Sequence, residues 1–128
     1  MKLLLDTQLL LWAAGQPERL SSKAIELLKN EQNDLLFSAA SLWEITIQCS
    51  LGRSDFSVNP RLLRRSLLDN GYQELPVRSE HTVATADLPF IHRDPFDRIF
   101  IAQATVEGFV FLTIDTLLEQ YGGPVRLV

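Results

Sequence analysis

The chain has 128 residues, of which 46% are hydrophobic and 22% charged, a balance that is typical of a globular protein and excludes a disordered one. This length predicts a single domain over residues 1–128. Asp6 interrupts the apolar start before it reaches the length of a signal peptide, and no apolar run is as long as a membrane span, so we expect a cytoplasmic protein.

The net charge of −4 disfavours a protein that binds nucleic acid by bulk electrostatic attraction. That exclusion fails if several of the acids surround a cation, which would neutralise their charge locally. The single cysteine, Cys49, has no partner for an internal disulfide or a thiolate metal site, and we interpret it as a core residue.

The start of the chain alternates strand and helix patterns. Residues 2–5 predict a short strand, and the apolar residues from Leu9 to Ala13 recur at helical spacing, which leaves Asp6 at the turn. A second helix is predicted from Ser21 or Ser22 to the polar stretch 30–34. Residues 35–37 predict a second buried strand.

Two helices are predicted in the middle of the chain. Ser38 is a good N-cap for the first, which carries Glu44 in an apolar segment and closes at Gly52. After a loop over residues 55–58, Asn59-Pro60 opens the second, which ends at Asn70-Gly71. We expect one face of the second helix to be apolar (Leu62, Leu63, Leu67, Leu68) and the other to be solvated or to contact phosphates (Arg61, Arg64, Arg65).

Weaker patterns follow this helix. Residues 73–77 predict a strand, in which Pro76 indicates an edge or an end. Ser79 is predicted to cap a short helix that runs to Leu88 and is broken by Pro89.

A polar, proline-marked start at residues 92–97 runs directly into an apolar helical pattern. Asp94 is a good N-cap and Pro95 a good first helical residue, so a helix is predicted from Pro95 to about Glu107, ending at Gly108. Asp97 falls in its first turn, where the helix dipole stabilises a carboxylate. The cap position is already filled by Asp94, so Asp97 calls for a further explanation.

Residues 109–112 predict a third buried strand, which leads to Thr113-Ile114-Asp115. A short helix over 116–121 and a strand over 125–128 complete the chain. Strands that alternate with helices in this way predict an α/β fold with a mostly parallel central sheet.

Acidic residues follow the predicted strands. The carboxyl ends of parallel strands open on one edge of a sheet, where ligands bind, and Asp6 and Asp115 stand at that edge. Glu44 and Asp97 lie on helices that are able to lean toward it. Four carboxylates in one pocket require either strongly raised pKa values or a cation. Because oxygen ligands select a hard ion, the pattern predicts a Mg²⁺ or Mn²⁺ site.

Each acid also has a structural alternative. Asp6 and Asp115 are able to cap the helices that follow them, and Glu44 is able to pair with Arg98. We interpret His81 and His92 as surface or loop residues and not as metal ligands. Thr7 and Thr113 lie beside the predicted pocket and are candidates for orienting water.

Four segments together resemble the PIN-domain nucleases, and among them the toxin ribonucleases of VapBC-type toxin–antitoxin pairs: Leu4-Leu5-Asp6-Thr7, Ser41-Leu42-Trp43-Glu44-Ile45, His92-Arg93-Asp94-Pro95-Phe96-Asp97-Arg98 and Leu112-Thr113-Ile114-Asp115. The resemblance implies a PIN-like three-layer fold whose catalytic and metal-binding residues are Asp6, Glu44, Asp97 and Asp115. Gln8 and Gln48 stand where the closest subgroup would have histidine and lysine, which affects substrate contacts more than metal binding.

The same resemblance implies a Mg²⁺- or Mn²⁺-dependent endoribonuclease that hydrolyses RNA phosphodiester bonds with an activated water. It also implies a cognate antitoxin as partner and a homodimer. Two other classes stay open: a phosphoacceptor signalling domain of receiver type, and a catalytically weak binding module with an acidic metal pocket. A receiver-type domain needs a lysine at the end of a late strand, and the candidate strand ends have none.

Overall fold

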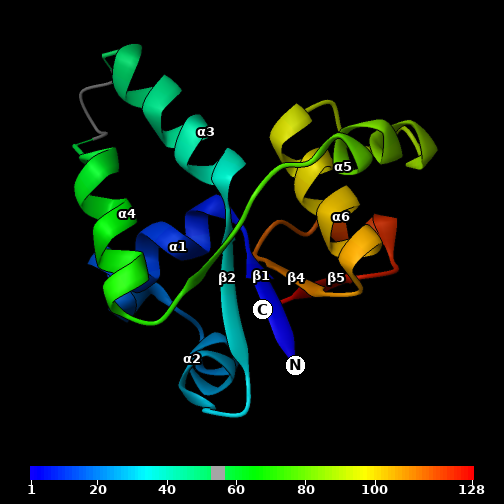
Figure 1. Cartoon of the computed structure of the whole chain (residues 1–128). Helices are drawn as coiled ribbons and strands as arrows, with labels where there is room; N and C mark the ends of the chain where they lie inside the picture. The colour runs from blue at the N-terminus through cyan, green and yellow to red at the C-terminus, as the bar shows by residue number, and fades with distance from the viewer. Residues whose placement is uncertain (53–56) are drawn as a thin grey trace.

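The computed structural model describes residues 1–52 and 57–128 (Figure 1). Its elements are β1 (Lys2–Leu5), α1 (Thr7–Gly15), the 3₁₀ helix η1 (Pro17–Arg19), α2 (Ser22–Lys29), β2 (Asp34–Ser38), α3 (Ala39–Ser50), α4 (Pro60–Asp69), β3 (Gln73–Leu75), α5 (Ser79–Ala84), η2 (Thr85–Asp87), α6 (Pro95–Glu107), β4 (Val110–Thr113), η3 (Leu118–Tyr121) and β5 (Val125–Leu127). Residues 55 and 56 of the loop predicted over 55–58 lie outside the described ranges.

The strands form one five-stranded sheet in the order β3-β2-β1-β4-β5, and every pair in it is parallel. β1 lies at the centre, where Leu3 pairs with Leu35 of β2 and with Val110 of β4. This topology brings the carboxyl ends of β1 and β4 side by side, so Asp6 and Asp115 follow neighbouring strands.

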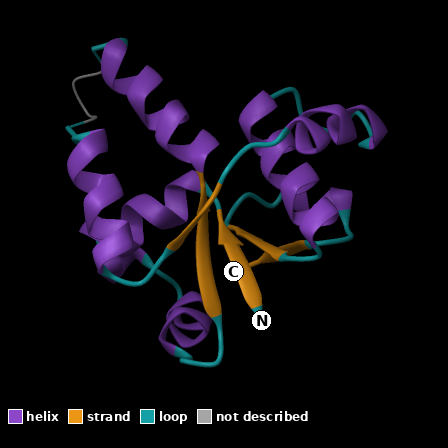
Figure 2. Cartoon of the chain, in the orientation of Figure 1, coloured by secondary structure: helices purple, strands orange, loops and turns teal. Residues whose placement is uncertain are grey.

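Helices cover both faces of the sheet (Figures 1 and 2). Successive side chains of β1 point to opposite faces, so Leu3 and Leu5 pack in one cluster with residues of α1, α3 and α4, whereas Leu4 packs in a second cluster with α6. Because both faces are buried, the strands read as continuous apolar runs. The predicted α/β fold, with a parallel sheet between two helical layers, is confirmed.

Several boundaries differ from the prediction. β3 ends at Leu75, before Pro76, and the helix predicted over 79–88 is split into α5 and η2. The N-cap of α5 is Arg78, so Ser79 is not the cap as predicted. The reason is that Nδ1 of His81 accepts the Arg78 backbone N–H at 3.0 Å, in a capping box where sequence rules expect Glu or Gln and not histidine. The last predicted helix is only the 3₁₀ turn η3.

In α4 the arginines are exposed as predicted, but the apolar face is narrower than expected, because Leu63 and Leu67 are buried whereas Leu62 and Leu68 are exposed. Cys49 is only partly buried and packs against the core cluster on the α1 side of the sheet. Within residues 1–52 and 57–128, none of the helices combines the length and the apolar character needed to span a lipid bilayer.

Candidate metal centre

A cavity of about 450 Å³ opens at the carboxyl ends of β1 and β4. It takes residues from α1, α3, the start of α6 and the segment after β4. We call it the acidic cavity, because its lining includes the carboxylates of Asp6, Glu44, Asp94, Asp97 and Asp115. All four acids that the sequence singled out therefore line one cavity, together with Asp94.

Asp6 is the N-cap of α1 and is 6% exposed. Its Oδ1 accepts the Leu9 backbone N–H at 2.8 Å, and its Oδ2 accepts the hydroxyl of Thr113 at 2.7 Å. Burial raises the pKa of this carboxyl, the two hydrogen bonds oppose the rise, and the charge of Asp115 adds to it. Asp6 therefore fills the structural role that sequence reasoning offered as an alternative, and still lines the acidic cavity.

Glu44 faces the cavity from the second turn of α3. Its Oε1 accepts the hydroxyl of Thr7 at 2.6 Å, and that hydroxyl also lies 3.1 Å from Oγ of Ser41. Burial raises the pKa of Glu44 against the effect of Thr7, and the negative charges of Asp94 and Asp6 raise it further.

Arg98, the partner suggested for Glu44, is engaged elsewhere. Its guanidinium donates to the carbonyls of Thr85 and Pro89 and to the hydroxyl of Tyr121, at 2.8, 2.9 and 3.2 Å. The alternative of a Glu44–Arg98 ion pair inside the fold is therefore wrong.

Asp94 is the N-cap of α6, as predicted: its Oδ1 accepts the Phe96 backbone N–H at 2.9 Å, and Pro95 is the first helical residue. Asp97 follows in the first turn with a side chain that is 20% exposed. Burial raises the pKa of Asp97 to about 8, and the charges of Asp94, Glu44, Asp6 and Asp115 contribute in that order.

Asp115 closes the ring of acids. Its Oδ1 accepts the Leu117 backbone N–H at 2.9 Å, and its own N–H donates to the hydroxyl of Thr113 at 3.1 Å. Asp115 thus caps the turn after β4 while it lines the acidic cavity. Thr7 and Thr113 hold carboxylates of this cavity, a role more specific than the predicted orientation of water.

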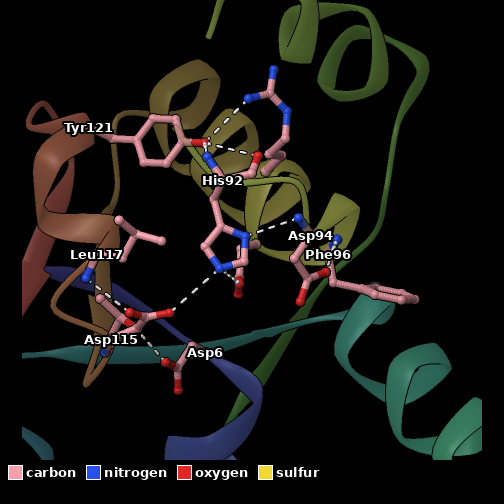
Figure 3. A network of polar contacts seen from close by, with 10 residues as sticks. Asp6, His92, Asp94, Phe96, Asp115, Leu117 and Tyr121 are labelled. Atoms are coloured by element: carbon pink, nitrogen blue, oxygen red, sulfur yellow. Dashed lines mark hydrogen bonds and ion pairs between the residues drawn. The ribbon is translucent and has the colours of Figure 1, made fainter. Parts of the chain in front are cut away.

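His92 lies in the loop before α6, as predicted, but its ring faces the acids (Figure 3). Its Nδ1 accepts the Asp94 backbone N–H at 2.9 Å, and its Nε2 lies 3.8 Å from Oδ2 of Asp97 and 3.8 Å from Oδ2 of Asp115. Sequence reasoning missed this residue. The signal available was its position two residues before an N-cap, from which a side chain is able to accept the N–H of the cap residue.

The other histidine contradicts its interpretation as a surface or loop residue. His81 is fully buried between α5 and α6. Its Nδ1 accepts the Arg78 backbone N–H, and its Nε2 lies 3.1 Å from Oε2 of Glu107. Because each nitrogen has a partner inside the fold, this residue fills a structural role on the side of the sheet covered by α6.

The donors around the cavity fit a divalent cation. Carboxylate oxygens are the preferred ligands of hard ions, and one oxygen of Asp97 and one of Asp115 lie within 4.8 Å of each other and of a ring nitrogen of His92. An isolated Asp97 carboxylate is disfavoured here by burial and by its neighbours, and a bound cation would reverse that penalty. The arrangement is therefore able to hold a divalent ion, which would neutralise charge on a phosphate and activate water when bound.

Comparison with known families assigns most of the chain to one model. The family model described as "PIN domain" matches residues 3–124. No curated protein matches the sequence.

Solved structures support the same fold. VapBC2 from Rickettsia felis, bound to a DNA fragment from its promoter, matches with a TM-score of 0.72 at 15% identity, over 99% of this chain and 98% of that one. A toxin–antitoxin complex from Klebsiella pneumoniae matches with a TM-score of 0.64 at 16% identity, over 96% and 94% of the two chains. VapBC-1 from nontypeable Haemophilus influenzae gives 0.63 at 18% identity, over 100% and 97%.

Proposed function

Since this chain belongs to the PIN-domain family, we propose that it is a Mg²⁺- or Mn²⁺-dependent endoribonuclease and the toxin of a toxin–antitoxin pair. The proposed site consists of Asp6, Glu44, Asp97 and Asp115, within one domain that spans residues 1–128. The observation that carries the proposal is the gathering of five carboxylates around one cavity, where the pKa of Asp97 is raised to about 8. Such crowding is costly in an empty pocket and favourable around a cation.

The side chains divide the work by their surroundings. Asp6, Glu44 and Asp115 are held by donors of the protein, which presents them in fixed positions. Asp97 supplies a negative charge that burial and the neighbouring carboxylates disfavour without a cation. A bound ion would lower the pKa of water and stabilise charge on the phosphate. The carboxylates would hold the ion, and one of them would accept the proton that leaves the attacking water.

The receiver-type alternative gains no support from the cavity. Phosphoacceptor chemistry of that kind needs a lysine beside the acids, and the described residues that line the acidic cavity include none. Gln8 and Gln48 both line the cavity, so they stand where the RNA strand would contact the protein beside the metal.

The direct test is cleavage of a 5′-labelled single-stranded RNA by the purified protein with Mn²⁺, with Mg²⁺ and with EDTA. Attack by an activated water expels the 3′ oxygen and leaves 5′-phosphate and 3′-hydroxyl ends. A contaminating metal-independent ribonuclease would leave a 2′,3′-cyclic phosphate instead. We expect cleavage that requires the metal and leaves 5′-phosphate ends.

Two variants locate the activity. Glu44→Gln and Asp97→Asn keep the size of the side chain and remove a charge, so each should lower cleavage by at least about 100-fold while the fold persists. Asp87→Asn removes the same charge from an exposed position in η2 and is the matched control. Metal-dependent cleavage that survives in Glu44→Gln and Asp97→Asn would show that the acidic cavity is not the active site.

We further propose a small antitoxin as partner, supported by the fold shared with proteins that were solved as VapBC and other toxin–antitoxin complexes. The expected result is that expression of this chain arrests growth, and that co-expression of the small protein from the neighbouring reading frame restores growth and yields a complex. Free growth with the chain expressed alone would contradict the proposal.

We also propose that the chain forms a homodimer through an aromatic groove, a hollow of about 950 Å³ between α3, α5 and the start of α6. Phe90 beside it is 92% exposed, and Trp43 on its rim is 64% exposed and packs edge-on against Phe96 at 5.4 Å. A protruding ring next to an apolar hollow on one face suits a two-fold interface, in which each copy inserts its ring into the other.

Light scattering after gel filtration tests the homodimer. Trp43→Glu with Phe90→Glu should convert it to monomer. Leu62→Glu, at a leucine that is 66% exposed on α4 and outside the groove, should leave it intact. A wild-type chain that stays monomeric at high concentration would refute this part of the proposal.

A further inference from the structure

We propose that His92 is a positioning residue for the metal centre. Its Nε2–H faces the carboxylates of Asp97 and Asp115 and fixes both in the orientation that holds the cation. This inference rests on the proposed metal-dependent function. It adds to the site a residue that is not a carboxylate and that lies in the loop between η2 and α6.

The tautomer of His92 follows from its surroundings. Its Nδ1 accepts the Asp94 backbone N–H at 2.9 Å, so that nitrogen presents a lone pair and the ring proton sits on Nε2. The N–H group of Nε2 therefore faces the acids. If Nδ1 were free, the proton could sit on Nδ1 and leave Nε2 without a donor. The cap of α6 and the orientation of the imidazole are thereby set by the same contact.

Nε2 lies 3.8 Å from one oxygen of each acid. Figure 3 marks the contact between His92 and Asp115 with a dashed line. This separation exceeds a direct hydrogen bond, so the donor reaches either carboxylate through a small shift or one water. Among the described residues, the Asp97 carboxylate accepts no side-chain or backbone hydrogen bond, whereas Asp115 accepts one from Leu117 on its other oxygen. The His92 donor is thus the one that orients Asp97.

The loop that carries His92 is held from behind. The backbone N–H of His92 donates to the hydroxyl of Tyr121 at 2.9 Å, and Arg98 donates to the same hydroxyl at 3.2 Å. Arg98 also binds the carbonyls of Thr85 and Pro89. Figure 3 shows this chain of contacts running from Tyr121 through His92 to the acids. These contacts hold the backbone of His92 in place, so its side chain is able to position the carboxylates beside it.

Two substitutions separate the positioning role from a merely structural one. The amide oxygen of Asn takes the place of Nδ1, so His92→Asn keeps the acceptor for the Asp94 N–H and loses the donor. The amide nitrogen of Gln reaches the place of Nε2, so His92→Gln keeps the donor and weakens the local turn. If His92 is only structural, His92→Asn should have the higher melting temperature without metal. If His92 positions the carboxylates, His92→Gln should bind Mn²⁺ more tightly than His92→Asn.

The experiment measures Mn²⁺ binding by titration calorimetry and thermal melts in EDTA on the full chain. We expect His92→Asn to bind Mn²⁺ about 10- to 100-fold more weakly than the wild type, with an unchanged apo melting temperature. His92→Gln should bind within a few-fold of the wild type even if it melts earlier. Tyr121→Phe should weaken Mn²⁺ binding by a smaller factor, and Tyr72→Phe, a tyrosine packed in the opposite core cluster, should not.

The outcomes are distinct. If His92→Asn binds Mn²⁺ as tightly as the wild type, the positioning role is refuted and the proposed function stands. If the Asn and Gln variants lose affinity equally and both melt early, His92 is only structural and the inference fails. A folded wild type that binds no Mn²⁺ overturns the proposed function and this inference with it.

Discussion

The replacement Asp97→Asn should stabilise the protein in the absence of metal while it removes activity. Asp97 has no donor among the described residues apart from the distant His92, and four carboxylates of the acidic cavity surround it. Its pKa rises from 3.8 to about 8 in the folded chain. Asparagine fills the same space without a group to titrate, so the repulsion disappears.

The size of the effect follows from the linkage between protonation and folding. Between pH 4 and pH 8 the folded chain keeps a proton on Asp97 that the unfolded chain has released, so stability falls as pH rises through this window. Each unit is worth about 1.4 kcal/mol, which sets a ceiling of about 4 kcal/mol at pH 7. Because the cavity is open to water, we expect a gain of about 1–3 kcal/mol for Asp97→Asn.

Urea unfolding in EDTA at pH 5, 6, 7 and 8 measures this gain. The advantage of Asp97→Asn over the wild type should grow with pH and be smallest at pH 5. For a chain of this size 1 kcal/mol corresponds to about 3–5 °C in melting temperature. Asp87→Asn should show no such pH-dependent gain. A variant as stable as the wild type at every pH, or less stable at pH 8, would refute the reasoning.

Three further outcomes are expected. Millimolar Mn²⁺ should raise the melting temperature of the wild type, because a concentration of 100 times the dissociation constant adds about 2.7 kcal/mol to the free energy of unfolding. The melting temperature of Asp97→Asn should barely change, and thermal scans of both proteins measure this. Asp94→Asn should keep the cap of α6, since Asn and Asp cap equally well, and should retain most of the metal-dependent RNA cleavage, whereas an inactive variant would show that Asp94 is itself a ligand. His81→Leu should lower the free energy of unfolding by about 1–3 kcal/mol in urea without altering Mn²⁺ binding, because the Arg78 N–H and Glu107 lose their partner.

Most of the sheet and the major helix starts could be predicted, because their signals are local. Ser38, Asn59 and Asp94 cap their helices through hydrogen bonds to N–H groups two or three residues ahead in the chain, which sequence spacing captures. The gathering of carboxylates could be predicted too, since the topology of a parallel sheet fixes which edge its strand ends share.

The contacts of the histidines could not be predicted, because they depend on distant partners. His81 meets Glu107 across 26 positions, and the backbone of His92 meets Tyr121 across 29. The residues next to a histidine in sequence can show that it lies in a loop, but they do not indicate which distant residue its side chain contacts. The same holds for Arg98, which donates to the carbonyls of Thr85 and Pro89 and to the hydroxyl of Tyr121, and not to Glu44.

The hydrogen bonds of the acidic cavity lead to one more measurable consequence. Asp6, Glu44, Asp94 and Asp115 each accept a hydrogen bond from the protein, whereas Asp97 accepts none from the described residues. Asp97 stands apart with its pKa of about 8, which leaves it largely protonated at pH 7. A cation needs the ionised carboxylate, so binding must expel that proton.

Mn²⁺ binding at pH 7 should therefore release the proton that Asp97 carries, and this contribution should decline toward pH 9, where Asp97 is already ionised. Titration calorimetry in two buffers of different ionisation enthalpy counts the released protons. Asp94→Asn should still release a proton, although at a lower pH, because the charge of Asp94 contributes to the raised pKa of Asp97. Binding to the wild type without proton release at pH 7 would mean that Asp97 is ionised before the metal arrives, and the cation would then owe its affinity to some other feature of the cavity.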